Sequence, residues 1–273
     1  MTHSELSRAS GALTPFVHPT ASVDQGAEIG PGVRIGPHAV IEAHVKIGEG
    51  SWIGPHVVIQ EWTALGRDCR VYAGAALGGV PQDRHFKGER SYLRIGDRVT
   101  LREYVSVSRA TGEEAQTIIG DDTMMMAYAH AGHNCQIGRN VIIANFTQLS
   151  GHVVVEDRAV FSGMAGVLQF TRIGTVAMVS GMARIRKDVA PYMLVEGEPL
   201  RCVAINRIGL QRAGVSPEVQ LQLRRAHRLL VRSGLDVSRA LERIEQDLGG
   251  SPEMDHLVRF IRESQARGRG INR

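Results

Sequence analysis

Aliphatic residues recur at every sixth position through most of the chain. The phase runs unbroken from Val17 to Leu77, and a small or short residue usually follows four positions later. It resumes at Ile95 and, after a second break, continues from Ile119 to Ile185. A helix, with about 3.6 residues per turn, does not have this period, and neither does a strand that alternates along its length. The pattern predicts a short strand and a tight turn, repeated many times.

This period resembles the hexapeptide repeat of left-handed parallel β-helices. The resemblance implies that three hexapeptides form one triangular coil of about eighteen residues, with the aliphatic side chain inside and the small residue near a corner. Glycine often follows the aliphatic residue, as in Ile29-Gly30, and there we expect unusual backbone angles. Cys69 and Cys135 fall on the small inward position, so we expect both side chains in the core.

The six-residue phase breaks at residues 78–94 and again at residues 108–117. In a solenoid, insertions of this kind form loops on one face, which is often the binding face. We therefore expect functional residues close to these two segments.

Helix signals replace the repeat beyond Pro191. Ser216-Pro217-Glu218 and Ser251-Pro252-Glu253 are typical of helix starts, Gly234 is typical of a helix end, and Leu241–Leu248 suits a short helix between them. The predicted fold class is mainly β: a left-handed parallel β-helix of hexapeptide repeats followed by a small C-terminal α-helical domain. The predicted organisation is a polar N-terminal extension (1–14), the β-helix with its two insertions (15–190) and the helical domain (191–273).

Composition and charge fit this architecture. Thirty-one glycines and only 5% aromatic residues suit a narrow prism, and a net charge of +4 with 43% hydrophobic residues does not indicate disorder. Residues 200–273 carry 14 arginines and 8 acidic residues, which predicts an acidic partner for this end or a solvated helical surface. No apolar run approaches the roughly 20 residues of a membrane span, and the polar start does not resemble a secretory signal. Three widely spaced cysteines do not predict a disulfide framework. We expect a cytoplasmic protein without stable membrane insertion or a nucleic-acid partner.

One column of residues carries candidate chemistry. Residues eighteen apart should stack on successive coils, separated by about 4.8 Å, which places His133, Gly151 and Gln169 in one row. His133 offers a base, Gly151 an unobstructed backbone N–H, and Gln169 a neutral hydrogen-bonding group. His130 and His152 flank this row, and neither His130 nor His133 falls on the inward aliphatic position.

These groups suit direct acyl transfer. A histidine can take a proton from a hydroxyl or amine that attacks an acyl carbon, and a backbone N–H one coil away can stabilise the oxyanion. Three alternatives stay open. Histidines such as His38 and His56 have similar positions without an evident role, so the candidate histidines could be structural as well. His130, His133 and His152 could instead bind zinc, as in the carbonic anhydrases built on the same β-helix. The prism could also be a non-catalytic scaffold.

Several stretches resemble the UDP-N-acetylglucosamine acyltransferase family of lipid A biosynthesis, and the likeness extends from about residue 15 to the C-terminal helices. The matching segments are Phe16-Val17-His18-Pro19-Thr20-Ala21, Pro81-Gln82-Asp83, Ala129-His130-Ala131-Gly132-His133-Asn134-Cys135, Leu149-Ser150-Gly151-His152-Val153, Gln169-Phe170 and Asn206-Arg207-Ile208-Gly209-Leu210-Gln211-Arg212. The two insertions combined with a helical end make this likeness more specific than the hexapeptides alone.

The resemblance implies an enzyme that moves an (R)-3-hydroxyacyl chain from acyl carrier protein to the 3-hydroxyl of UDP-N-acetylglucosamine, the first step of lipid A biosynthesis. It implies a homotrimer with sites at subunit interfaces. No metal is expected, and no cofactor beyond the donor's 4′-phosphopantetheine thioester.

The same resemblance assigns roles to individual residues. It makes His133 the general base, with Asn134 beside it, and Gly151 the oxyanion donor. The substrate-binding positions that it implies are Asp83, His85, His130, His152, Gln169, Asn206 and Arg212. Gly181 matches a position that helps to set acyl-chain length, and a glycine there leaves room for a longer chain. Arg224, Arg225 and Arg228 are expected to dock the acidic carrier protein.

The chain departs from the family pattern at four positions. Asn134 replaces the aspartate that usually follows the base, and His85 replaces a lysine in the first insertion. Ser108 and Leu168 stand where the family has histidines. These changes leave open a related activity, N-acylation of an amino-sugar nucleotide from acyl carrier protein or acyl-coenzyme A.

Overall fold

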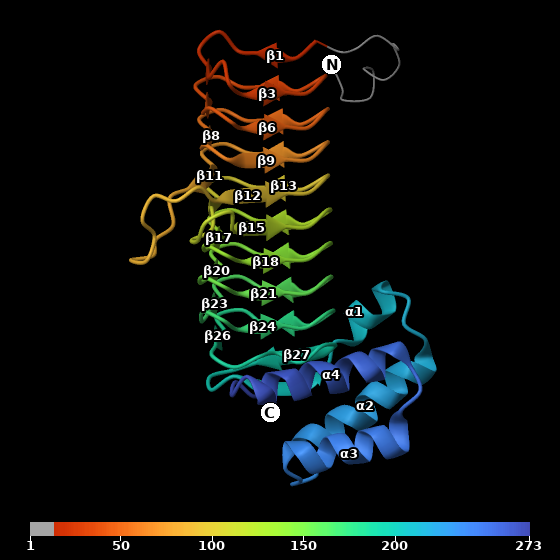
Figure 1. Ribbon diagram of the computed structural model, residues 1–273. Helices are drawn as coiled ribbons and strands as arrows, with labels where there is room; N and C mark the ends of the chain where they lie inside the picture. The colour runs from red at the N-terminus through yellow and green to blue at the C-terminus, as the bar shows by residue number, and fades with distance from the viewer. Residues whose placement is uncertain (1–13) are drawn as a thin grey trace.

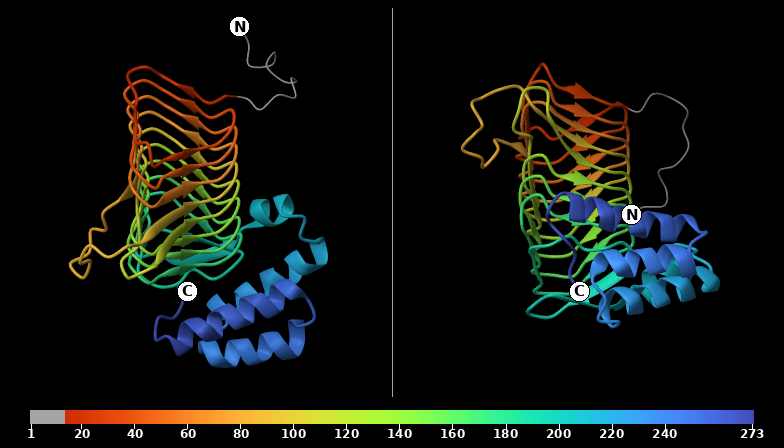
Figure 2. Two further views of the ribbon diagram at one scale, coloured as in Figure 1. Left: turned by 45° about the horizontal axis from the view of Figure 1, so that its top comes forward. Right: turned by 60° about the horizontal axis from the view of Figure 1, so that its bottom comes forward.

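A computed structural model describes residues 14–273 and contains the predicted left-handed parallel β-helix, followed by four helices (Figure 1). Three parallel sheets form the three faces of a triangular prism, and the helices lie at its C-terminal end (Figure 2). The predicted polar extension, 1–14, lies outside the described residues except for its last position. Among the described helices, none has the length and apolar character needed to cross a membrane.

Face A of the prism is the longest sheet, and all of its neighbouring strands are parallel except the last pair. Its strands are β1 (Phe16–Val17), β4 (Arg34–Ile35), β7 (Trp52–Ile53), β10 (Arg70–Val71), β13 (Thr100–Leu101), β16 (Met124–Met125), β19 (Ile142–Ile143), β22 (Val160–Phe161), β25 (Met178–Val179), β27 (Met193–Glu196) and β28 (Arg201–Ile205). β27 and β28 follow the end of the six-residue phase, and β28 turns the chain back toward the helices.

Face B precedes the corner from which both insertions leave. Its strands are β2 (Ser22–Val23), β5 (Val40–Ile41), β8 (Val58–Ile59), β11 (Ala76–Gly79), β14 (Ser106–Ser108), β17 (His130–Ala131), β20 (Gln148–Leu149), β23 (Gly166–Val167) and β26 (Arg184–Ile185). The first insertion follows β11 and projects from the prism, and the second follows β14 on the next coil (Figure 1).

Face C completes each coil. Its strands are β3 (Glu28–Ile29), β6 (Lys46–Ile47), β9 (Thr63–Leu65), β12 (Tyr92–Ile95), β15 (Gln116–Ile119), β18 (Gln136–Ile137), β21 (Val154–Val155) and β24 (Arg172–Ile173). Both insertions therefore leave from the corner between faces B and C, the B–C corner. The segment that joins β17 to β18, which contains His133, occupies the same corner one coil further on.

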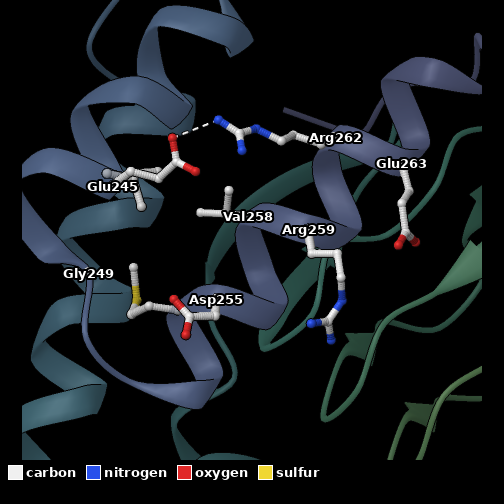
Figure 3. Close-up of a pocket in the computed structure, with 9 residues that line it drawn as sticks. Glu245, Gly249, Asp255, Val258, Arg259, Arg262 and Glu263 are labelled. Atoms are coloured by element: carbon white, nitrogen blue, oxygen red, sulfur yellow. Dashed lines mark hydrogen bonds and ion pairs between the residues drawn. The ribbon is translucent and has the colours of Figure 1, made fainter.

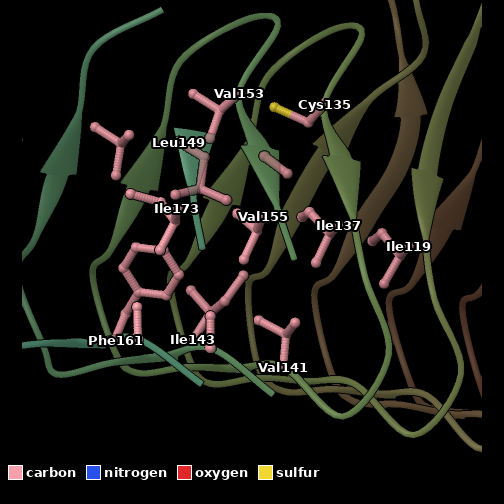
Figure 4. Close-up of a cluster of buried hydrophobic side chains, with 14 of the residues drawn as sticks. Ile119, Cys135, Ile137, Val141, Ile143, Leu149, Val153, Val155, Phe161 and Ile173 are labelled. Atoms are coloured by element: carbon pink, nitrogen blue, oxygen red, sulfur yellow. The ribbon is translucent and has the colours of Figure 1, made fainter. Parts of the chain in front are cut away.

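The periodic aliphatic residues fill the prism. Ile137, Ile143, Leu149 and Phe161 come from all three faces and meet in the interior, each with at most 2% of its surface exposed (Figure 4). Burying a side chain of this size contributes about 1.5–3 kcal/mol. Cys69 and Cys135 are buried as predicted, and burial raises their pKa values to about 11 and about 12.

The corners require left-handed backbone angles, and non-glycine residues adopt them. Tyr128, Asn134, Phe146 and His152 all have a φ near +60°, a conformation that costs about 1–2 kcal/mol per residue. Contacts between coils offset this cost: the rings of Tyr128 and Phe146 stack with centroids 5.0 Å apart. His38 and His56 stack in the same way, so these two histidines have a structural role.

The expected reason for glycine after the aliphatic residue is wrong. Gly36 and Gly48 do not have a positive φ. A Cβ on Gly48 would lie 2.5 Å from the carbonyl carbon of Gly66, and one on Gly36 would lie 3.0 Å from that of Gly54. Glycine is required because successive coils approach too closely for a side chain.

The four helices are α1 (Arg207–Arg212), α2 (Pro217–Val231), α3 (Val237–Leu248) and α4 (Pro252–Ala266). The predicted starts of α2 and α4 are confirmed, since Ser216 and Ser251 accept hydrogen bonds from Val219 and Met254 as N-caps. α1 was not predicted.

Charged side chains hold α4 against face C. Arg172, in β24, pairs with Glu156 at 3.1 Å and with Glu263 of α4 at 2.7 Å. His256 of α4 lies 3.1 Å from the other oxygen of Glu156. Asp188 is fully buried and pairs with Arg267 beyond the helix. The helical end is therefore attached to the prism through several ionic contacts.

Candidate active site

A cavity of about 370 Å³ lies at the B–C corner, beside β17 and β20. It brings together four predicted site residues: His130, His133, Gly151 and Gln169. Residues that the sequence argument had not assigned complete the wall, and they include Gln82, Ser108 and Gln148. The cavity therefore lies where the insertions and the candidate histidine share one edge of the prism.

The imidazole of His133 lies directly over Gly151 of the next coil. A Cβ on Gly151 would stand 2.6 Å from Cε1 of His133 and closer still to Nε2. Only glycine permits this approach. Within the described chain, the N–H of Gly151 has no hydrogen-bond partner, so it is available to a ligand in the cavity.

Asn134 determines which nitrogen of His133 carries the proton. Its Oδ1 accepts a hydrogen bond from the N–H of Thr111, and its Nδ2 donates to the C=O of Thr111, both at 3.0 Å. This pair of backbone contacts fixes the orientation of the amide. The same Oδ1 lies 2.8 Å from Nδ1 of His133, so Nδ1–H must be the donor. The neutral ring consequently keeps its lone pair on Nε2, which faces Gly151.

The first insertion brings Asp83 to the same imidazole. Oδ2 of Asp83 lies 3.9 Å from Nδ1 of His133, and the two side chains are only 16% and 14% exposed. Oδ1 of Asp83 accepts a hydrogen bond from the N–H of His85 and lies 3.0 Å from Nδ1 of His85. The backbone hydrogen bond from His85 lowers the pKa of Asp83 to about 2, and the side chains of His85 and His133 act in the same direction. Asp83 is therefore a carboxylate at neutral pH.

Two further histidines border the base. Nδ1 of His130 lies 2.8 Å from Oγ of Ser106, and His152 packs edge-on against His133 with ring centroids 5.2 Å apart. The second face of His152 stacks on Phe170 at 4.7 Å. Burial lowers the pKa of His130, and burial followed by the nearby His133 lowers that of His152. Both rings therefore favour the neutral form.

The remaining predicted residues do not line this cavity within one chain. His85 is exposed. Gly181 lies at an exposed corner after β25, and Arg212 is exposed in the last turn of α1. The amide of Asn206 is used inside the chain, since it caps α1 at Gly209 and donates to the C=O of Val176 at 2.8 Å.

The three predicted docking arginines are exposed on α2. Arg225 and Arg228 line a groove of about 490 Å³ that also contains Arg232 and ends at Asp247 of α3. Arg224 lies outside this groove. The groove is thus mainly basic.

Another cavity, of about 310 Å³, lies between α3 and α4 and contains none of the predicted residues. Figure 3 shows Glu245 and Arg262 paired across it, with their charged atoms 2.6 Å apart. Across residues 14–273, no group of three His, Cys, Asp or Glu side chains is arranged to hold a metal ion.

Sequence reasoning missed Gln148 and Thr111 for different reasons. Gln148 pairs in register with His130 on the next coil, so the eighteen-residue spacing could have found it. Thr111 lies in the second insertion, whose path has no period, and no sequence signal indicates its contact with Asn134.

The chemistry of this arrangement is that of proton abstraction next to an oxyanion site. A lone pair on Nε2 of His133 can accept a proton from an attacking hydroxyl or amine. The free N–H of Gly151 can donate to an oxygen that becomes negative in the same step.

Two family models match the chain. The model described as UDP N-acetylglucosamine O-acyltransferase, domain 2, matches residues 188–272. The bacterial transferase hexapeptide model, which contains six repeats, matches residues 44–79 and 116–151.

Similar proteins match most of the chain. The acyl-[acyl-carrier-protein]–UDP-N-acetylglucosamine O-acyltransferase of Anaeromyxobacter dehalogenans is 42% identical over 94% of this chain and 99% of its own length. The protein of the same name from Gloeothece citriformis is 46% identical over 74% of this chain and 73% of its own length. Among solved structures, the UDP-N-acetylglucosamine acyltransferase of Bacteroides fragilis matches with a TM-score of 0.91 and 36% identity, over 94% of this chain and all of that one.

Proposed function

The chain belongs to the UDP-N-acetylglucosamine O-acyltransferase family, and on this premise we propose that it transfers an acyl chain from acyl carrier protein to the 3-hydroxyl of UDP-N-acetylglucosamine. The proposed chain is an (R)-3-hydroxyacyl group, and the proposed reaction is the first step of lipid A biosynthesis. The observation that carries the proposal is the approach of Nε2 of His133 to the backbone of Gly151 inside one cavity.

In the proposed mechanism His133 is the general base. Its Nε2 takes the proton of the sugar hydroxyl as that oxygen attacks the thioester carbon. The carbonyl oxygen becomes an oxyanion and accepts a hydrogen bond from the N–H of Gly151. When the intermediate collapses, the carbon–sulfur bond breaks and the imidazolium returns the proton to the leaving thiolate. The two substrates, the sugar hydroxyl and the phosphopantetheine thioester of the donor, supply every bond in this step, and we propose no further cofactor.

We propose a homotrimer with each site completed by a neighbouring subunit. Support comes from a row of exposed apolar residues, 47–79% exposed, along the corner between faces A and B. These residues are Tyr104, Tyr128, Phe146, Met164 and Met182. A continuous apolar row of this kind is typical of an interaction surface. Gly181 adjoins this row, and Gly181 and Arg212 are exposed outside their own chain's cavity, so in the proposed trimer they would contribute to a neighbour's site. The amide of Asn206 is already bonded within its own chain.

The basic groove on α2 is the proposed docking surface for acyl carrier protein. Arg225 and Arg228 line it and Arg224 is exposed beside it, which suits a strongly acidic partner. Since both proposed substrates are soluble molecules of the cytoplasm, we propose that the protein acts there.

Substitution of the base tests the proposed function. Purified protein and its His133→Ala variant would be incubated with (R)-3-hydroxyacyl carrier proteins of several lengths. Each incubation would use either UDP-N-acetylglucosamine or its 3-amino analogue, with products read by mass spectrometry. We expect an O-acylated sugar nucleotide with the wild type and none with the variant, at nearly unchanged thermal stability. A folded variant with full activity would overturn the mechanism. If the wild type acylated only the 3-amino analogue, the acceptor would be an amino-sugar nucleotide and the proposed acceptor would be wrong.

A further inference from the structure

Two different residues lie beside Nδ1 of His133, Asn134 and Asp83, where a single aspartate could perform two tasks. A group beside the Nδ1 atom of a catalytic histidine can hold the ring in one tautomer, and it can also supply negative charge to the imidazolium that forms during the reaction. Asn134 performs the first task, because its oxygen accepts the Nδ1–H at 2.8 Å and Thr111 fixes the amide in place. An amide carries no net charge, so Asn134 cannot perform the second.

Asp83 is in position to supply the missing charge. Its Oδ2 lies 3.9 Å from the same Nδ1 of His133, and both side chains are largely shielded from solvent. Its other oxygen, Oδ1, faces the backbone and ring of His85, so the two oxygens have separate partners. The carboxylate thus approaches the base from the first insertion, whereas Asn134 adjoins the base in the β17–β18 segment and is held there by Thr111 of the second insertion.

The other titratable groups around His133 do not replace this carboxylate. His130 and His152 favour their neutral forms because burial lowers the pKa of each. His85 is exposed, and its Nδ1 contacts Oδ1 of Asp83, the oxygen that does not face His133. Among the described ion pairs of His133, the one with Asp83 is the only contact with an acid.

We propose that Asp83 is a positioning residue that acts through His133 as the counter-charge of its imidazolium, while Asn134 fixes only the tautomer. The proposal rests on the proposed function, and it gives Asp83 a role beyond the contact with substrate that the family resemblance implies. At 3.9 Å, a unit charge in a medium of effective dielectric between about 20 and 80 changes a protonation equilibrium by roughly tenfold or more.

The test compares Asp83→Asn with Glu113→Gln. Asparagine keeps an oxygen that can accept the hydrogen bond from the N–H of His85, so the loop turn is preserved while the charge is removed. Glu113→Gln removes an equal charge from an exposed position of the second insertion. The first measurement is an NMR titration of the His133 ring in the free protein, with its signal identified by its loss in His133→Ala.

We expect the titration midpoint of this ring to fall by about one pH unit in Asp83→Asn and to stay unchanged in Glu113→Gln. The acidic limb of the kcat/KM profile should move by the same amount, and kcat should fall about tenfold or more. An unchanged midpoint in Asp83→Asn, or an equal change in both variants, would overturn the proposal. So would a raised KM for the sugar nucleotide with kcat and the pH profile unchanged, since that result assigns Asp83 to substrate binding alone. Because the titration needs no substrate, a failure of the proposed function would leave this result readable.

Discussion

Adding one methyl group at Gly151 is the sharpest perturbation that the site offers. In Gly151→Ala, the new Cβ would lie 2.6 Å from Cε1 and 3.0 Å from Cδ2 of His133, whereas ordinary contacts begin at 3.4 Å. The ring must therefore move away by about 1 Å. Asn134 opposes this movement, because it holds Nδ1 at 2.8 Å.

The size of the effect follows from this displacement. A misplacement of about 1 Å at a catalytic group costs on the order of 100-fold in rate, which corresponds to about 2.7 kcal/mol of transition-state stabilisation. Loss of the hydrogen bond to Asn134 would lower the free energy of unfolding by only about 0.5–1.5 kcal/mol. Gly151→Ala should thus remain folded and lose most of its activity.

The assay is kcat/KM for acylation of UDP-N-acetylglucosamine by acyl carrier protein, measured together with thermal unfolding. Gly166→Ala is the matched control, since a Cβ at Gly166 meets no atom within 4 Å and the residue lies one coil beyond Gln148 on face B. We expect full activity from this control. If Gly151→Ala kept more than a third of the wild-type rate, the argument that His133 acts from its observed position over Gly151 would be refuted.

Three further predictions concern neighbouring features. Asn134→Asp should lower the free energy of unfolding by about 1–3 kcal/mol in a urea titration, because a carboxylate oxygen would replace the N–H that now bonds to the Thr111 carbonyl at 3.0 Å; an unchanged midpoint would contradict that reading. Burial raises the pKa of Glu156, but hydrogen bonding and charge from His256, with smaller contributions from Thr175 and Arg172, outweigh it and hold the pKa below the usual 4.5. A depressed pKa gives stability that is lost as the pH falls through the folded-state value. Below pH 4.5 the free energy of unfolding should therefore fall more steeply with pH in the wild type than in Glu156→Gln. Parallel plots of unfolding free energy against pH would contradict this. Replacement of Arg224, Arg225 and Arg228 by Glu should lower kcat/KM for carrier-protein donors at least tenfold and leave kcat/KM for short pantetheine thioesters unchanged. Equal losses with both donors would refute the docking surface.

The repeat could be predicted because most coils have the same spacing. Strands could not be predicted where that spacing changes. Val179 pairs with Val195, sixteen residues later rather than eighteen. The last coil is therefore two residues shorter, and a period of six cannot detect β27. The positions of the glycines fit the repeat, but the predicted reason for them was wrong. The close approach at Gly48 involves Gly66, eighteen positions away on the next coil, and backbone angles at Gly48 itself do not reveal it.

The same distinction separates the predictable and unpredictable parts of the site. His133 and Gly151 could be paired from sequence because both belong to the repeat. Asp83 could not be placed against His133, nor Thr111 against Asn134, because each lies in an insertion whose path follows no period. The orientation of the Asn134 amide depends on the backbone of Thr111, so the tautomer of His133 follows from the fold and not from the sequence pattern.

Each hexapeptide separates the residues that make the protein fold from those that perform chemistry. Inward positions such as Ile137 and Leu149 are sealed inside the prism, whereas His133 and Gly151 belong to the adjoining corner and contribute little to that interior. Selection can therefore revise the edge of the prism, including the length of its two loops, without altering the aliphatic lattice beneath it. A scaffold of this kind can acquire a new acceptor specificity with little loss of folding stability.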